Sequence, residues 1–467
     1  MQTLESSYML PTLASFPAID VHPATAPWVN AKLPRPLPSW TFFLLLALLV
    51  TAPASTKVAG AAWLLVVLMG LWAALRLPVA RSLGHSLVQS SRLWLLACLV
   101  ALVLQAVPIL YWSDPWGDRH VEIRLLLAAG SSFALMRRVR LLPQQKIWLT
   151  HALALACCVA LAVTSVNGRM TPSNPIPWAA GVSFFVCVLM PLVLQTHISP
   201  WQRTAWGLAV LAGIAAVLLS LSRGSYGLVL WGLCVAGVVT TQQLLKFRRH
   251  KKSGKLGNQT ARLWFTGIAV AFTLFTVLLI SFPRNSQVMV GRVQEALTEI
   301  ENINTPGLPQ THVINTAVGA RLHMWRMALG KIAQAPLLGH GSKARIAWIH
   351  QLGVTDGSET IKSLSHLHSD SLTTLFDHGL FGLSSYLALG VGLAFLALRR
   401  KYCGITMRWI LAGILWMHLT SGLTNMNFGH NYYGVMLALS LSLAWMLSSD
   451  ETTEKQTQEI EEDVRQG

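Results

Sequence analysis

Runs of apolar residues long enough to cross a bilayer recur along most of the chain. A spanning helix needs roughly 20 predominantly apolar residues. The pattern therefore predicts an all-α integral membrane protein in which one polytopic bundle uses most of the chain. The predicted spans, about twelve in number, are 40–55, 58–76, 93–112, 121–138, 147–166, 178–196, 204–221, 224–245, 263–281, 380–398, 408–424 and 430–448.

The polar stretches between these runs divide the chain into five parts. The longest of them is expected to form a loop subdomain with two amphipathic helices, in "RNSQVMVGRVQEALTEIENI" and "GARLHMWRMALGKIAQ". Pro336 is expected to end the second helix. The five parts are a Pro-rich tail (1–39), spans one to nine (40–281), the loop subdomain (282–372), spans ten to twelve (373–448) and an acidic tail (449–467).

Composition and charge agree with a membrane protein. The chain is 53% hydrophobic and only 12% charged, whereas soluble domains carry about 25% charged residues. The net charge of +17 could suggest a nucleic-acid partner, but the basic residues gather in connections such as "KFRRHKKSGKLGNQTAR", "RRVRLLPQQK" and "RRKYCGITMR". With twelve spans these connections share one side, which the positive-inside bias assigns to the cytoplasm. Both termini are then cytoplasmic, the long loop faces the periplasm of a bacterium, and no nucleic acid is expected to bind.

Three arginines require an explanation. Arg223, in "SLSRGS", stands between two apolar runs, where an arginine costs about 2.5–3.5 kcal/mol and marks a functional site by default. Arg321 lies on the second amphipathic pattern, and Arg124 lies near one end of its span. A guanidinium suits phosphate oxygens. The alternatives are snorkelling for Arg223, ordinary exposure for Arg321, and pairing with Glu122 or a lipid phosphate for Arg124.

Histidines mark the entry to the tenth span. "HLHSDSLTTLFDHGLFG" contains His366 and His368, and His340 lies in "PLLGHG". An imidazole can act as a general base at periplasmic pH, or it can simply cap or brace a loop. The six cysteines lie in apolar spans or one basic loop, and neither a CxxC nor a helical His-x-x-x-His spacing occurs. No metal and no other cofactor is expected. Arginines and a histidine on one face of an apolar bundle suit a lipid-linked anion whose phosphates lie at the membrane surface.

Three motifs resemble those of bacterial O-antigen ligases. "HSDSLTTLFDHGLFG" is similar to their His-[Asn/Ser/Gln]-x9-Gly-x-x-Gly pattern. "SLSRGS" resembles the Ser-Arg-Gly motif that the ligases share with O-antigen polymerases, and the run from Arg321 to "PLLGHG" resembles their periplasmic-loop motif. The first pattern is opened by His368 and Ser369 and closed by Gly379 and Gly382.

The resemblance implies a reaction and a role for each motif. The donor would be O-antigen on undecaprenyl diphosphate, and the acceptor a sugar of lipid A-core at the periplasmic face of the inner membrane. Arg223 and Arg321 would bind the diphosphate, with Arg124 as a further candidate. His368 would be the general base of a metal-independent, inverting transfer. The fold would resemble the GT-C glycosyltransferases, with membrane lipids around it.

The residues alone leave several points open. They do not rank His340 and His366 against His368, and they assign no role to Asp370 or Asp377. They do not indicate an oligomeric state. An O-antigen polymerase and a protein O-oligosaccharyltransferase share the donor. A transporter of a lipid-linked anion is the alternative from another class, although paired halves are not evident in the sequence.

Overall fold

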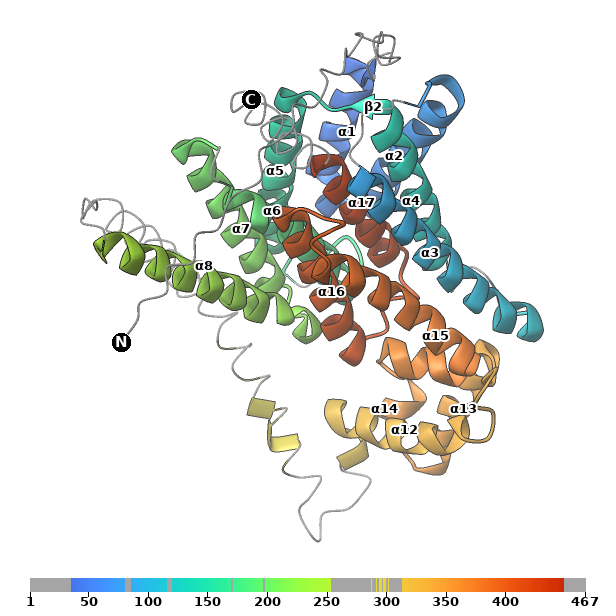
Figure 1. Cartoon of the computed structure of the whole chain (residues 1–467). Helices are drawn as coiled ribbons and strands as arrows, with labels where there is room; N and C mark the ends of the chain where they lie inside the picture. The colour runs from blue at the N-terminus through green and yellow to red at the C-terminus, as the bar shows by residue number, and fades with distance from the viewer. Residues whose placement is uncertain are drawn as a thin grey trace, which may run out of the picture.

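A bundle of long apolar helices carries a smaller group of helices at one end (Figure 1). This computed structural model describes residues 35–79, 85–115, 120–168, 171–195, 198–252 and 313–448, together with scattered positions between 287 and 301. The predicted span 263–281, residues 1–34 of the N-terminal tail, the acidic tail and most of the first amphipathic pattern lie outside the described residues.

Every other predicted span coincides with a helix. Six helices in the described part are long and apolar enough to cross a membrane: α2, α3, α5, α6, α7 and α15. Two short segments, β1 (Arg35–Pro36) and β2 (Val139–Arg140), pair in parallel beside the bundle. The bundle helices are α1 (Ser39–Thr51), α2 (Thr56–Arg76), α3 (His85–Trp112), α4 (Val121–Arg138), α5 (Pro143–Asn167), α6 (Pro175–Val193), α7 (Pro200–Leu219), α8 (Gly227–Lys252), α15 (Asp370–Leu398), α16 (Ile405–Thr424) and α17 (Asn431–Leu447).

Helix α6 runs through the middle of the bundle, as its burial shows. Of its most apolar window, 89% is buried, against 33% for the window of α2. A helix that is apolar all round is stable only when it is surrounded, and α6 packs against α7, α16 and α17. On α2, by contrast, Leu64, Leu68, Leu71 and Leu75 form an exposed apolar stripe, as expected of a surface that faces lipid.

The described part of the loop subdomain, from residue 313 to the start of α15, has a small core of its own. It contains α12 (Ala317–Ile332), α13 (Ser342–Thr355) and α14 (Glu359–Lys362). Met324, Ile349 and Leu367 are buried together with Phe376 of α15. The second amphipathic pattern is indeed helical as α12, which ends at Ile332, before Pro336. Helices α13 and α14 were not predicted.

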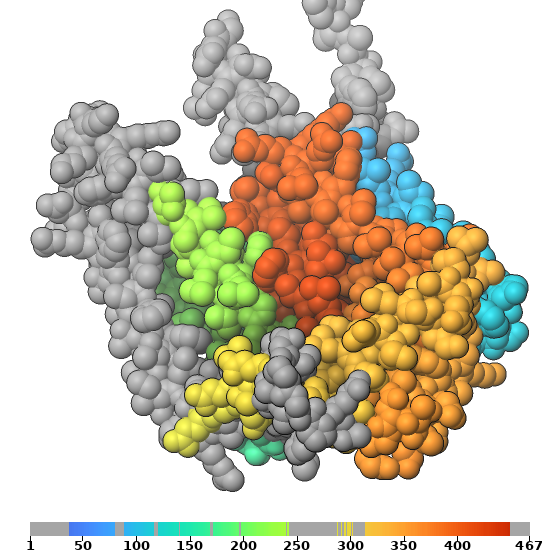
Figure 2. Space-filling view, turned by 90° about the horizontal axis from the view of Figure 1, so that it is seen from below, coloured from blue at the N-terminus to red at the C-terminus, as the bar shows by residue number. Residues whose placement is uncertain are grey.

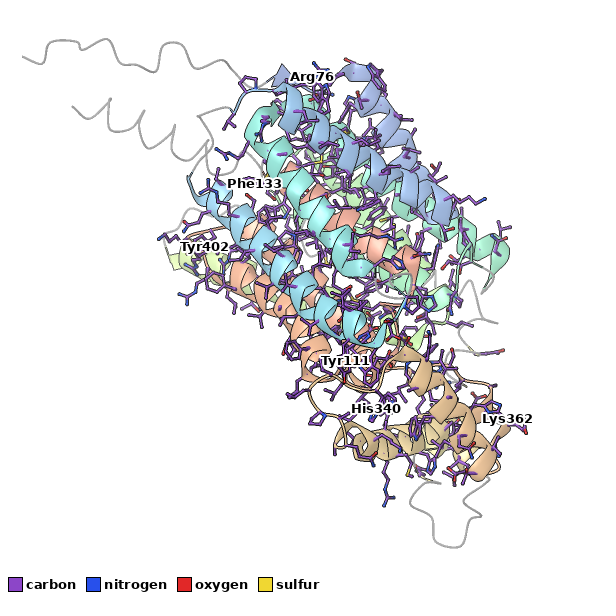
Figure 3. All side chains as sticks on the ribbon, turned by 90° about the vertical axis from the view of Figure 1, so that its right-hand side faces the viewer. Arg76, Tyr111, Phe133, His340, Lys362 and Tyr402 are labelled. Atoms are coloured by element: carbon purple, nitrogen blue, oxygen red, sulfur yellow. The ribbon has the colours of Figure 1, made fainter. Side chains whose placement is uncertain are left out.

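The subdomain joins the bundle at the ends of α3 and α15. Trp112, the last residue of α3, donates its indole N–H to the carbonyl of Leu338 over 2.8 Å. Figure 3 shows the neighbouring Tyr111 and His340 at this junction, with Lys362 at the far side of the subdomain. Figure 2 looks onto this end, where the orange-red α16–α17 region lies between the green α8 and the amber α12–α14 segments.

Helix α15 begins ten residues before the predicted span at 380. It starts at Asp370 and is kinked at Gly379, where φ is 58°. The predicted boundary between loop and span at 372/373 therefore falls inside this helix. Its first turns, up to the kink, complete the subdomain, and the remainder belongs to the bundle.

Candidate functional site

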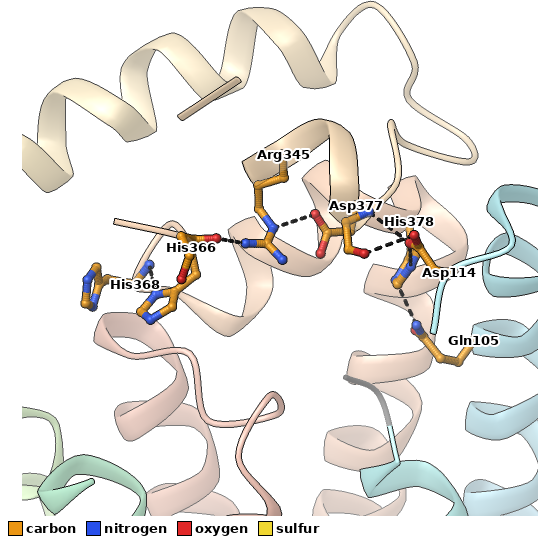
Figure 4. A network of polar contacts seen from close by, with 9 residues as sticks. Gln105, Asp114, Arg345, His366, His368, Asp377 and His378 are labelled. Atoms are coloured by element: carbon orange, nitrogen blue, oxygen red, sulfur yellow. Dashed lines mark hydrogen bonds and ion pairs between the residues drawn. The ribbon is translucent and has the colours of Figure 1, made fainter. Parts of the chain in front are cut away.

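Two imidazoles lie together on the loop that enters α15. This histidine loop (residues 363–369) buries Leu367 completely, whereas the flanking His366 and His368 remain partly exposed. Their ring centroids are 4.2 Å apart, and the backbone N–H of His368 donates to Nδ1 of His366 over 3.3 Å. His368 has a φ of 54°, a left-handed conformation that is uncommon for a residue with a side chain. The pair is drawn in Figure 4.

The loop is held at three neighbouring points. Trp325 of α12 donates its indole N–H to the carbonyl of Leu367 over 2.6 Å. Arg345 of α13 donates from a terminal nitrogen to the carbonyl of Ser365. Ser369 is the N-cap of α15, because its hydroxyl accepts the N–H of Leu372 over 3.4 Å. Ser369 of the predicted motif thus starts the helix that follows the histidine.

Arg321 lies beside the histidine loop, and Arg223 lies near Arg321. Arg321 precedes Trp325 by four residues on α12, so both occupy the same face of the helix that contacts the loop. Burial, followed by the charge of Arg223, lowers the pKa of Arg321, against an opposing effect of Glu299. Arg223 itself is 32% exposed and lies 3.9 Å from the carboxylate of Glu295.

The turn after α16 contacts both the element that contains Arg223 and the start of α15. Arg223 belongs to the short 3-10 helix η3 (Arg223–Ser225), and a Cβ on the next residue, Gly224, would overlap the side chain of Asn425. On the other side of this turn, the buried Asp370 accepts the backbone N–H groups of Asn427 over 2.7 Å and Phe428 over 2.9 Å. Gly224 therefore allows a close approach of η3 to a turn that Asp370 fixes against the start of α15.

Both imidazoles of the histidine loop are neutral at neutral pH. Burial lowers the pKa of His366 to about 4, with smaller effects from Arg345, His430 and Arg321. Burial also lowers the pKa of His368 to about 3, helped by His366 and Arg321. Because Nδ1 of His366 accepts a hydrogen bond, the proton of that ring is on Nε2. Nδ1 of His368 has no hydrogen-bond partner within the described part of the chain.

Arg124 and His340 have structural contacts. The two terminal nitrogens of Arg124 donate to the backbone carbonyl of Asn431 over 2.9 Å and to its side-chain oxygen over 3.0 Å, at the start of α17. Nε2 of His340 donates to the carbonyl of Lys331 over 2.8 Å, and its ring lies on Phe376 with centroids 5.2 Å apart. His340 thus joins α12 to α15.

The two motif glycines allow α15 to kink around the loop before α13. The N–H of His340 donates to Phe376 over 2.9 Å, and the N–H of Leu380 donates to Pro336 over 2.8 Å, so the loop 336–341 pairs with the kinked backbone. A Cβ on Gly379 would overlap the backbone of this loop. A Cβ on Gly382 would lie 2.5 Å from the side chain of His378. The glycines therefore shape the helix that follows the histidine.

A buried polar network behind the loop was not predicted. Asp377 accepts Nε of Arg345 over 2.7 Å. The adjacent His378 lies 3.2 Å from Asp114 through Nε2 and 2.8 Å from the amide nitrogen of Gln105 through Nδ1. Figure 4 shows the resulting chain from α3 to the histidine loop.

Asp114 is held as a carboxylate in this network. Burial raises its pKa, but hydrogen bonds from His378 and from the backbone and hydroxyl of Ser342 outweigh burial, and the pKa is lowered. The N–H and hydroxyl of Ser342 donate over 2.8 and 2.9 Å. Asp114 thereby ties the start of α13 to the end of α3.

The arrangement can bind an anion and accept a proton. Arg321 and the nearby Arg223 supply positive charge, and the neutral imidazole of His368 lies beside Arg321. Within the described residues, no three His, Cys, Asp or Glu side chains are grouped as metal ligands would be.

The middle of the chain matches a known protein family. Residues 208–387 match the family model described as O-antigen ligase. The resemblance carried by the three motifs is confirmed: over these residues the chain is similar to O-antigen ligases. The matched segment includes Arg223, Arg321 and the histidine loop. A comparison with curated proteins found no match.

Proposed function

We propose that this protein is an O-antigen ligase, which transfers O-antigen polysaccharide from undecaprenyl diphosphate to a sugar of lipid A-core. The observation that carries the proposal is the neutral His368 beside Arg321, with Arg223 near Arg321, inside the segment that is similar to O-antigen ligases. The reaction takes place at the periplasmic face of the bacterial inner membrane. This topology rests on about twelve spans with cytoplasmic termini and a periplasmic segment 282–372, as the basic connections favour.

The donor binds through its diphosphate. Burial lowers the pKa of Arg321, and the charge of Arg223 lowers it further, so the two guanidinium groups repel each other in the free protein. A doubly charged diphosphate between them removes this repulsion and accepts charge-assisted hydrogen bonds. Arg124 supports the site indirectly, because it holds the start of α17.

His368 removes the proton from the acceptor hydroxyl. As the hydroxyl oxygen attacks the anomeric carbon, the bond from that carbon to the diphosphate oxygen breaks and the configuration inverts. The proton moves to the imidazole of His368, and the electron pair leaves with undecaprenyl diphosphate. Fixed positive charges stabilise the departing phosphate oxygens, so the transfer is metal-independent.

A transfer assay tests this function. Purified protein in detergent is mixed with undecaprenyl-diphosphate-linked glycan and lipid A-core in the presence of EDTA, and the products are separated by size. We expect glycan attached to lipid A-core. Lengthening of the lipid-linked glycan alone would identify a polymerase, and transfer to a Ser- or Thr-containing protein instead would identify an oligosaccharyltransferase. Without any transfer, lipid transport in proteoliposomes would be the function to test.

A further inference from the structure

Arg345 and Asp377 form an ion pair inside the protein. Nε of Arg345 lies 2.7 Å from the carboxylate of Asp377, and the two side chains are only 5% and 1% exposed. Burying two charges is costly, and such a pair is weak support for stability. Its retention here is better explained by what else the guanidinium contacts.

We propose that Arg345 is a positioning residue for the two imidazoles: anchored on Asp377, it holds the Ser365 carbonyl and so fixes His366 and His368 beside the arginine site. This inference rests on the proposed function. Arg345 is not a catalytic residue, because it acts through the loop.

The geometry of the guanidinium makes this role specific to arginine. Its planar fork places Nε on Asp377 and a terminal nitrogen on Ser365 at a set separation and angle. Arg345 therefore holds helix α15 and the histidine loop together at Ser365, the residue before His366. A lysine has one ammonium on a flexible stem and cannot hold both partners in this geometry.

The anchor is itself tied to the membrane bundle. Asp377 is followed by His378, which contacts Asp114 and Gln105 at the end of α3. Figure 4 shows His378 between Asp114 and Gln105, next to Asp377, which faces Arg345. The imidazoles are thereby held in a fixed position relative to the membrane bundle, from which the lipid-linked donor must enter.

Arg345 also contributes positive charge at His366. The groups that act on this imidazole are Arg345, His430 of the α16–α17 turn and Arg321 of α12, after burial, and together they lower its pKa to about 4. Loss of the charge of Arg345 should raise the pKa of His366, whereas an Arg345→Lys variant should leave it near the wild-type value. Charge and position can therefore be separated by experiment.

The test compares full-length Arg345→Lys with the neutral double variant Arg345→Gln/Asp377→Asn. The double variant removes the charge without leaving Asp377 buried and unpaired. His323→Gln is the matched control, because it changes another polar contact of the subdomain, between His323 and Asp356 at 2.7 Å, that involves no residue of the histidine loop. All variants are first checked for a monodisperse folded form in detergent.

Two readouts are measured. In the transfer assay, Arg345→Lys should lower kcat on the order of 100-fold, as an ångström-scale misplacement does, and change the donor KM much less. His323→Gln should stay near wild type. Independently of activity, diethyl pyrocarbonate labelling against pH, read by mass spectrometry, should show a changed rate at His368 in Arg345→Lys. In the double variant the labelling midpoint of His366 should shift to higher pH.

The outcomes are distinguishable. A folded Arg345→Lys with wild-type kcat and wild-type labelling would overturn the inference, as would an equal loss of kcat in His323→Gln. If wild type transfers no glycan, the proposed function fails, while the labelling experiment still decides whether Arg345 positions the imidazoles.

Discussion

The acid side of the pH–rate profile tests the electrostatics of the site. His368 must be neutral to accept a proton, so protonation abolishes transfer. Burial, His366 and Arg321 lower the pKa of His368 to about 3 in the free protein. The profile of kcat/KM, which reports the free enzyme, should therefore stay flat well below the range in which histidines ordinarily titrate.

The two alternatives differ by a large factor at pH 5. A histidine with the ordinary pKa near 6.5 is only about 3% neutral there, which corresponds to a roughly 30-fold fall in kcat/KM. With a pKa of about 3, His368 stays almost fully neutral and kcat/KM changes little. Bound diphosphate offsets the charge of Arg321, so the pKa of His368 rises in the complex. The acid limb of kcat should therefore lie at higher pH than that of kcat/KM.

The assay measures initial transfer rates between about pH 4.5 and pH 8, at saturating and at low donor concentration, and the folded state is checked at each pH. Arg321→Gln should raise the pKa of His368 and bring the acid limb of kcat/KM toward the ordinary range. A 30-fold loss of kcat/KM at pH 5 in folded wild-type protein would refute the account of the low pKa.

Three further variants test parts of the site. Gly379→Ala places a Cβ against backbone at a positive φ, so it should lower the free energy of unfolding by more than about 2 kcal/mol. Gly330→Ala, with nothing within 4 Å, should not lower it. Equal melting temperatures of the two variants would contradict this explanation of the kink. Gly224→Ala should displace the turn at Asn425 and weaken donor binding, measured as a rise in KM; an unchanged KM would show that the close approach is unimportant. His340→Ala removes one hydrogen bond and should lower the free energy of unfolding by about 1 kcal/mol. Once folded, it should transfer glycan at close to the wild-type rate. Loss of transfer would make His340 a site residue.

The sequence predicted the residues that break the apolar pattern. Arg223 and the histidine pair are conspicuous because ionisable groups beside spanning segments are costly. Arg321 became a candidate through its motif, and the structure brings it to the loop through Trp325, one turn further along α12. These predictions depend on each residue's neighbours along the chain, which can be read from the sequence itself.

The supporting contacts could not be predicted in the same way. Arg345 and Asp377 are 32 residues apart, and Asp114 and His378 are 264 residues apart, so neither pair leaves a local pattern. The apolar pattern placed the start of the tenth span at residue 380, because hydropathy is averaged over many residues and does not reveal a kink. The kink at Gly379 exists because the loop 336–341 pairs with it, which is a tertiary contact.

The most direct test of the central claim is the rate of glycan transfer by His368→Ala, compared with His340→Ala. Both variants must fold and insert, and donor binding by each is measured separately. We expect His368→Ala to bind donor but to lose transfer by a factor of about 100 or more, as expected for a general base, while His340→Ala transfers at close to the wild-type rate. Transfer by folded His368→Ala at the wild-type rate would contradict the assignment of the base and, with it, the mechanism.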